Sequence, residues 1–101
     1  MIKKTLVYWR DIPAQVIVQE GRTREKAVLS TRFQEAIDRA AMRAGKGSSD
    51  AYMAEWRRVS SRCDETGNLR EFAESEASRL EAEFTDDYLL QLIRNHGSTR
   101  E

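Results

Sequence analysis

The sequence predicts an α+β fold, in which a small antiparallel sheet packs against two main helices and a short C-terminal helix. Three observations lead to this fold class. Two runs near the N-terminus, residues 5–9 and 16–18, are rich in the β-branched and aromatic residues that favour strands. Later stretches repeat apolar residues at the spacing of an amphipathic helix. The third is the length: 101 residues suit one domain, which we assign to residues 1–97 with a frayed tail at 98–101.

The two N-terminal runs predict a β-hairpin with strands near residues 3–10 and 14–20. Pro13 lies before the second strand, and because proline has no N–H to donate to a neighbouring strand, it suits a turn or a sheet edge. The next stretch, residues 20–26, is charged and has no apolar period. We interpret it as an exposed connection or as an irregular extension of the second strand, in which Gly21 can adopt a positive φ.

The best-specified helix is predicted at residues 32–44. Its apolar residues recur on one helical face, namely Phe33, Ala36, Ile37, Ala40, Ala41 and Ala44. Thr31 and Gln34 have the spacing of an N-terminal capping box, and Gly45 stands where a left-handed residue often ends a helix.

The segment around Tyr52 and Trp56 fits two patterns. Their spacing of four matches one face of a helix, whereas with Ala54 between them they alternate as in a strand. A two-stranded hairpin is only marginally stable on its own. We therefore favour a third strand at residues 52–60 that pairs with the hairpin.

A turn is predicted at residues 64–68, followed by a helix at 68–84 and a last helix at 86–95 that begins after Thr85. These elements together give a predicted hydrophobic core. Its members are Leu6, Tyr8, Val16, Val18, Phe33, Ile37, Ala40, Trp56, Leu69, Phe72, Leu80, Phe84, Leu89 and Ile93.

The charge balance argues against several classes of partner. The 17 basic and 17 acidic residues leave no excess of positive charge, so we expect no binding to nucleic acid. No apolar run approaches the length of a membrane span, and no signal peptide is visible, so we expect a cytoplasmic protein without membrane attachment. The charges are nevertheless separated, because residues 1–62 carry 13 bases and 7 acids and the remainder carry 4 and 10. This separation also allows weak self-association, in which the acidic helix of one copy meets the basic part of another.

No group of residues has the pattern of a catalytic centre or a metal site. Cys63 and His96 are the sole cysteine and histidine, which leaves no pair for zinc or for nucleophilic catalysis. The acidic residues of 68–84 are better explained as a solvated helix face. We expect no catalytic residue, no metal and no cofactor.

The most unusual segment is the predicted hairpin turn, which combines aromatic and polar residues. Trp9 and Arg10 could simply fill the core and end the strand, or they could belong to a surface of the aromatic and arginine type that is enriched at protein interfaces. If the third strand pairs with the hairpin, a second tryptophan–arginine pair lies beside the first. The candidate partner-binding residues are Tyr8, Trp9, Arg10, Asp11, Gln15, Trp56 and Arg57.

The segments LVYWRDIPAQVIV, RFQEAIDRAAMRAG, DAYMAEWRRV and RLEAEF together resemble a small bacterial domain family called "virulence factor", also found as one domain of conserved-virulence-factor-C-type proteins. The resemblance covers about residues 4–95. In multidomain relatives this domain is joined to an Nfu-N-terminal-like scaffold domain and HEAT-type repeats, which implies protein interaction more than catalysis.

The leading hypothesis is a non-catalytic protein-interaction module or small accessory subunit that binds another cytoplasmic protein. The resemblance also implies an alternative, a small enzyme or cofactor-binding subunit associated with folate- or corrinoid-dependent one-carbon methyl transfer. That alternative predicts a pocket at the hairpin turn that contains Arg10, Asp11 and Gln15, with a shifted carboxyl pKa.

Overall fold

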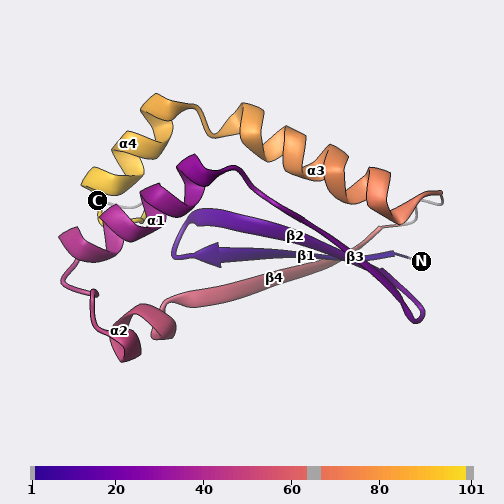
Figure 1. Ribbon diagram of the computed structural model, residues 1–101, viewed down its shortest axis with the longest axis horizontal. Helices are drawn as coiled ribbons and strands as arrows, with labels where there is room; N and C mark the ends of the chain where they lie inside the picture. Colours follow the sequence, from indigo (N-terminus) through magenta and orange to yellow (C-terminus); the bar gives the residue numbers. More distant parts are fainter. Residues whose placement is uncertain (1, 64–66, 100–101) are drawn as a thin grey trace.

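The computed structural model describes residues 2–63 and 67–99 and shows the expected α+β architecture. Its sheet has four strands, all antiparallel, in the order β3-β2-β1-β4 (Figure 1). The strands are β1 (Ile2–Trp9), β2 (Ile12–Glu20), β3 (Thr23–Val28) and β4 (Trp56–Cys63). β1 and β2 are therefore central, and β3 and β4 form the two edges.

The helices gather on one side of the sheet and at one of its ends (Figure 1). They are α1 (Thr31–Arg43), α2 (Ser49–Ala54), α3 (Leu69–Glu83) and α4 (Asp86–Arg94). α3 packs across β2 and β3, and α1 packs against α4 and β2. The short α2 lies beside the start of β4, at the same end as α1.

The pairing register separates the two faces of the sheet. Side chains alternate along a strand, so cross-strand partners share a face. On the face that α3 covers, Lys4 and Leu6 stand opposite Val18 and Val16, and Lys4 forms an ion pair with Glu76 of α3 at 3.4 Å. The opposite face, which begins with Lys3, is not packed against any helix in the described part of the chain.

The hairpin is longer than predicted, and its turn is shorter. The turn consists of Arg10 and Asp11 alone, and Pro13 lies within β2 opposite Tyr8. Proline is tolerated there because the pairing register shifts between Val7 and Tyr8. The row of hydrogen bonds between β1 and β2 is thus already interrupted where proline has no N–H to donate.

A complete strand, β3, occupies the charged stretch after Gly21. Of the two interpretations given to residues 20–26, the strand extension was therefore nearer to the structure than the exposed connection. Gly21 has a φ of +60° and turns the chain back on β2. The apolar pattern was absent because β3 is an edge strand with mostly exposed side chains.

The ambiguous segment turns out to contain a helix and then a strand. Tyr52 lies in α2, whereas Trp56 begins β4, with Glu55 ending the helix between them. The predicted strand at 52–60 thus pairs with β1 as expected but starts four residues later, and it continues to Cys63. Neither periodicity could extend through the whole segment because the secondary structure changes in the middle.

The four helices have different N-terminal caps. Asn68 and Thr85 cap α3 and α4 through their side chains, as their sequence context indicates. The capping box predicted for α1 is wrong, because Ser30 is its N-cap residue and makes no side-chain cap bond within the helix. Instead Glu81 of α3 accepts hydrogen bonds from both the backbone N–H and the hydroxyl of Ser30, at 2.7 and 2.8 Å.

This cap joins two helices through one carboxylate. Arg32 also donates to Glu81, and it reaches the carbonyl oxygen of Phe84 at the end of α3. Burial alone would raise the pKa of Glu81, but the bonds from Ser30 and Arg32 hold it below its ordinary value of 4.5. A distant residue therefore holds the N-cap residue of α1 in place.

The predicted core is largely confirmed, with four exceptions. Leu6, Tyr8, Trp56 and Phe72 are only partly buried, because each lies at the border of a covered region. The prediction also omitted several buried residues. These are Ile2, Trp9, Ile12, Leu29, Ala36, Ala41, Ala73 and Leu92.

The end of the chain packs back on the hairpin. After α4, His96 and Gly97 have φ values of +62° and +89°, and the Gly97 carbonyl oxygen accepts from the Asp11 N–H at 2.8 Å. Thr99 lies in the segment predicted to fray, yet its N–H and hydroxyl both donate to Asp11. Part of the predicted turn, residues 64–66, and the last two residues of the tail lie outside the described residues.

We predict that Gly97→Ala is more destabilising than Gly45→Ala. Both glycines have a positive φ, but a Cβ at Gly97 would lie 2.8 Å from Cζ3 of Trp9, whereas one at Gly45 would meet no atom within 4 Å. The expected losses of unfolding free energy are about 2–4 kcal/mol at Gly97 and about 1–2 kcal/mol at Gly45. Urea denaturation checks this, and equal losses at the two positions would contradict the close approach to Trp9.

Candidate functional site

The seven candidate residues fall into two separate places. Tyr8, Trp9, Arg10, Asp11 and Arg57 gather at the β1–β2 turn, where the chain ends meet. Gln15 and Trp56 line a cleft on the uncovered face of the sheet, and Arg57 also contributes to it. The residues of the first place bond to one another and to the chain end, whereas those of the second line a cleft.

Trp9 belongs to the core, so its assignment to a partner-binding surface is not supported. Its side chain is 0% exposed and donates its indole N–H to the carbonyl oxygen of Tyr52 at 2.9 Å. Its ring stacks on Tyr52 of α2 and lies against Gly97, which follows α4. Trp9 thus faces the helical end of the molecule rather than solvent.

Arg10 is engaged with its own chain. It has a φ of +53°, an unusual value for a residue other than glycine. Its backbone N–H donates to the Glu55 carbonyl oxygen at 3.1 Å, while its side chain pairs with the Glu55 carboxylate at 3.0 Å and donates to the His96 carbonyl oxygen. The guanidinium also lies over the ring of Trp9. The arginine–tryptophan stack anticipated from the sequence is present, but inside one molecule.

Asp11 and Arg57 complete this turn. Arg57 donates to the carbonyl oxygen of Arg10 and pairs with the Asp11 carboxylate at 2.9 Å, and its guanidinium lies over the ring of Tyr8. Burial alone would raise the pKa of Asp11, but hydrogen bonds from Thr99 and Arg57 hold it below its ordinary value of 3.8. A carboxylate held in its charged form by structural bonds is poorly suited to act as a proton donor or acceptor near neutral pH.

The uncovered face of the sheet presents three rows of four residues, read across the strands in the order β3-β2-β1-β4. The rows are Arg24–Gln19–Lys3–Arg62, Lys26–Ile17–Thr5–Ser60 and Val28–Gln15–Val7–Arg58. Five of these residues are basic, none is acidic, and all five bases are exposed. Among the described residues no ion-pair partner is found for any of the five.

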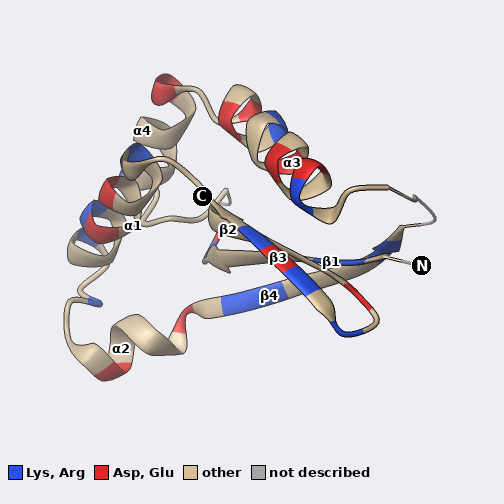
Figure 2. Ribbon diagram, turned by 45° about the vertical axis from the view of Figure 1, so that its right-hand side comes forward, with Lys and Arg blue, Asp and Glu red and all other residues tan. Residues whose placement is uncertain are grey.

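Positive charge is therefore sorted by face rather than spread evenly. Figure 2 shows lysine and arginine along β4 and β3, and acidic residues concentrated on α3 across the sheet. The acids of the strands, Glu20 and Glu25, have registers that place them with Val18 on the covered side. A chain of zero net charge thus has one strongly basic surface.

A cleft of about 600 Å³ lies at the end of this face nearest α2. Its lining is part apolar and part basic, and it consists of Val7, Gln15, Met53, Trp56, Arg57 and Arg58. Met53 is 64% exposed and Trp56 is half-buried, with its ring edge-on to Tyr52 at 5.8 Å. Exposed methionine and tryptophan beside arginine is a composition enriched at protein interfaces.

The sequence analysis missed most of this surface. Lys3, Arg24, Lys26, Arg58 and Arg62 were not singled out, although each follows the period of two that strands impose. In residues 23–28, the alternation of Arg24 and Lys26 with Glu25 was the available signal. It was overlooked because the stretch had no apolar period.

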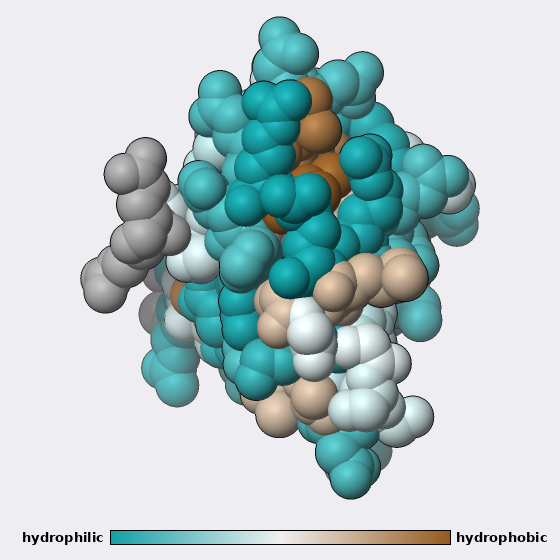
Figure 3. Space-filling view, turned by 90° about the vertical axis from the view of Figure 1, so that its left-hand side faces the viewer, coloured by the Kyte–Doolittle hydropathy of each residue, from teal (hydrophilic) through white to brown (hydrophobic). Residues whose placement is uncertain are grey.

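Other hollows offer less chemistry. One of about 210 Å³ lies between α1 and α4, where Leu89, Leu90 and Ile93 are framed by charged residues; Figure 3 shows an apolar area over these helices. Within residues 2–63 and 67–99, no three histidine, cysteine, aspartate or glutamate residues are placed to hold a metal ion. None of the helices described there has the length and apolarity needed to cross a membrane.

We predict that Trp9→Ala costs far more stability than Trp56→Ala. Removing a fully buried indole leaves a cavity and takes away one of the two hydrogen bonds to the Tyr52 carbonyl oxygen, with an expected loss of about 3–5 kcal/mol, whereas Trp56 is half-exposed. Urea denaturation followed by circular dichroism compares the two. A Trp9→Ala protein with an unchanged transition would contradict the burial of this ring.

We also predict that Asp11 stabilises the fold in a pH-dependent way. Because its pKa is lower in the folded state than in the unfolded state, its stabilisation is complete above the unfolded value and is lost as the pH falls through the folded one. The loss in unfolding free energy caused by Asp11→Asn should therefore be largest near neutral pH and shrink below about pH 4. A loss that stays constant down to acid pH would contradict this assignment.

Comparison with known proteins places the chain in a family. No curated protein and no solved structure gives a significant match. The model of one family, described as "Virulence factor", matches residues 7–93, which include β2, β3, β4 and α1 to α3 in full, the end of β1, and α4 up to its last residue but one. With most of its length matched, and with the hairpin, α1 and β4 in the expected order, this chain belongs to the virulence factor family.

Proposed function

We propose that this protein is a non-catalytic interaction module of the cytoplasm, and that it binds a partner protein on the uncovered face of its sheet. One observation carries the proposal: five exposed bases without an acidic neighbour adjoin a cleft that contains Met53 and Trp56. Interfaces combine such an apolar centre with a polar surround. The other face of the sheet is already filled by α3.

The face is also unusual as a purely solvated surface. Val28 is 68% exposed and Met53 is 64% exposed, and both lie at the same end of the face. Val7 and Ile17 are already buried, so the apolar groups that a partner would cover here are chiefly Val28 and Met53. A partner seated here would cover apolar groups that now contact water.

The methyl-transfer alternative has less support. It required Arg10, Asp11 and Gln15 in one pocket, but Gln15 lines the cleft while Arg10 and Asp11 bond to Glu55, Arg57 and the C-terminal segment. The pKa of Asp11 is shifted, but downward, which keeps the carboxylate ionised. These bonds are those of a structural turn.

We predict that Met53→Ser weakens capture of the partner about fivefold or more, because a central apolar side chain of an interface is removed. The measurement is affinity capture from cells that make the protein, with each tagged variant compared by quantitative mass spectrometry. Met42→Ser is the matched control, since Met42 is 76% exposed but lies on α1, away from the uncovered face. A partner that both variants retain, or that both lose, would contradict binding at this face.

A further inference from the structure

We propose that the partner's contacting segment is acidic and carries an apolar anchor, so that the anchor enters the cleft and the acids follow the bases toward the other end of the sheet. This inference rests on the proposed function and adds the chemistry of the partner.

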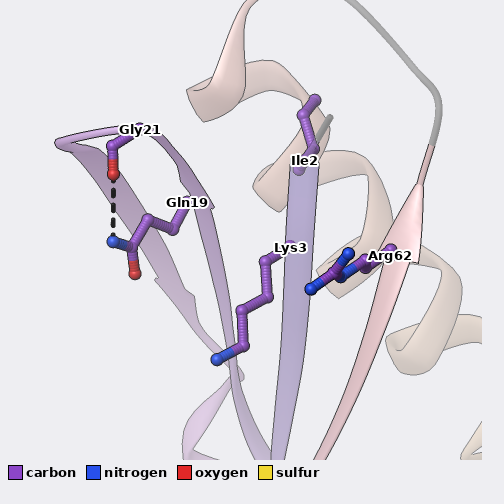
Figure 4. A pocket seen from close by; sticks show the side chains of 5 residues that line it. All are labelled: Ile2, Lys3, Gln19, Gly21 and Arg62. Carbon is purple, nitrogen blue, oxygen red and sulfur yellow. Dashed lines mark hydrogen bonds between the residues drawn. The ribbon is translucent and has the colours of Figure 1, made fainter.

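The basic end of the face holds like charges in direct opposition. Lys3 and Arg62 are cross-strand partners on β1 and β4, and such pairs have Cβ atoms about 4.5–5.5 Å apart and repel each other. They line a hollow of about 290 Å³ with Gln19, whose side-chain amide donates to the Gly21 carbonyl oxygen at 3.1 Å. Figure 4 shows Lys3 and Arg62 extending from neighbouring strands with no acidic residue among the side chains drawn. A carboxylate placed between them would turn this repulsion into attraction.

The charges continue from this hollow to the cleft. Arg58 and Arg62 lie on the same face of β4, four residues apart, which spans about 14 Å in an antiparallel strand. At the opposite edge, Arg24 lies in the row of Arg62, and Lys26 lies in the middle row, which has Ser60 on β4. Ser60 lies between the two arginines and bonds Thr5 at 3.0 Å, so the middle of the face is polar but uncharged at this edge.

The apolar cleft at one end of the face determines where the apolar side chain of the partner's segment lies. Met53, Trp56 and Val7 provide the apolar part of the cleft, and Arg58 stands at its border with the basic rows. A partner with one large apolar side chain followed by several carboxylates matches both halves at once. Whichever way its chain runs, the segment must place its apolar side chain at the cleft and its carboxylates toward Lys3 and Arg62.

Nucleic acid fits this face less well than an acidic protein segment. Sheets that bind single strands use aromatic rings on their central strands as stacking platforms. Here the residues of the central strands on this face are Lys3, Thr5, Val7, Gln15, Ile17 and Gln19. The ring of Trp56 is half-buried at the edge and packs against Tyr52, so it does not present a free flat face at the centre.

A second copy of the chain also fits poorly. The acid-rich element is α3, but Glu74, Glu76, Glu81 and Glu83 already form ion pairs within the molecule. Contact between α3 of one copy and the uncovered face of another would be head-to-tail, and such contacts extend into filaments unless they close into rings.

The test is an NMR titration of the ¹⁵N-labelled full chain with two matched peptides. One peptide has a single leucine followed by a run of glutamates, and its twin has glutamine in place of every glutamate. We expect the acidic peptide to shift the amide signals of β1, β3 and β4 on this face and the indole signal of Trp56. We expect it to bind at least about tenfold more tightly than the twin at low salt, and to lose this advantage at high salt.

The variants locate the effect on the face. The triple variant Lys3→Gln, Arg24→Gln, Arg62→Gln should reduce the affinity for the acidic peptide to that of the neutral twin. The matched control removes the same charge from exposed positions of α1 and α4, through Arg39→Gln, Arg43→Gln, Arg94→Gln, and should retain binding. Circular dichroism confirms that each variant is folded.

Several results would overturn the inference, and they separate it from the proposed function. Equal affinity for the two peptides, or equal loss in both triple variants, would refute an acidic partner. The Met53→Ser capture experiment tests binding at this face separately, because it does not depend on the charge of the partner. Tighter binding of an oligothymidylate or of phosphatidylglycerol vesicles at the same salt would assign the face to nucleic acid or to a membrane. Concentration-dependent dimerisation that the Lys3, Arg24, Arg62 variant abolishes would assign it to a second copy.

Discussion

The two-residue turn between β1 and β2 ties together segments that are far apart in the chain. The N–H groups of Arg10 and Asp11 donate to carbonyl oxygens of Glu55 and Gly97, and their side chains pair with Glu55 and Arg57. The turn therefore joins the hairpin, the junction of α2 with β4, and the C-terminal segment. An unpaired polar group at such a meeting point would be costly, and no buried side-chain nitrogen or oxygen of the described residues is left without a partner.

Trp9, which precedes this turn, packs against two of the segments that the hydrogen bonds of the turn join. Trp9 is fully buried, and its ring lies against Tyr52 and Gly97, so it connects the end of β1 to α2 and to the segment after α4. Only glycine fits at position 97, because both the backbone angle and the indole ring exclude a Cβ. Trp9 and Arg10, which most resemble interface residues in the sequence, are thus the ones that hold the hairpin to the helical end of the molecule.

The closing contacts lie at one end and α3 covers one side, so the other side of the sheet is the one on which we propose partner binding. The same arrangement sorts the charges: acids on α3 are largely neutralised by local arginines and Lys4, whereas the bases of the uncovered face have no acidic neighbours there. A net charge of zero conceals this because it averages over the two sides. That local imbalance would attract an acidic partner, and electrostatic complementarity of this kind favours orientation and rapid encounter.

The sequence by itself determined the fold class, the helices α1, α3 and α4 and most of the core, because these elements depend on local periodicity and on caps such as Asn68 and Thr85. It did not reveal β3 or the change from α2 to β4 at Glu55, since an exposed edge strand and a six-residue helix carry almost no apolar period. Nor could it decide whether Trp9 and Arg10 were core or surface, because that depends on Tyr52, Glu55 and Gly97, which only the tertiary structure brings to the turn. The basic face was likewise decided by tertiary structure: Lys3, Arg24 and Arg62 are distant in sequence, and strand pairing places them in one row.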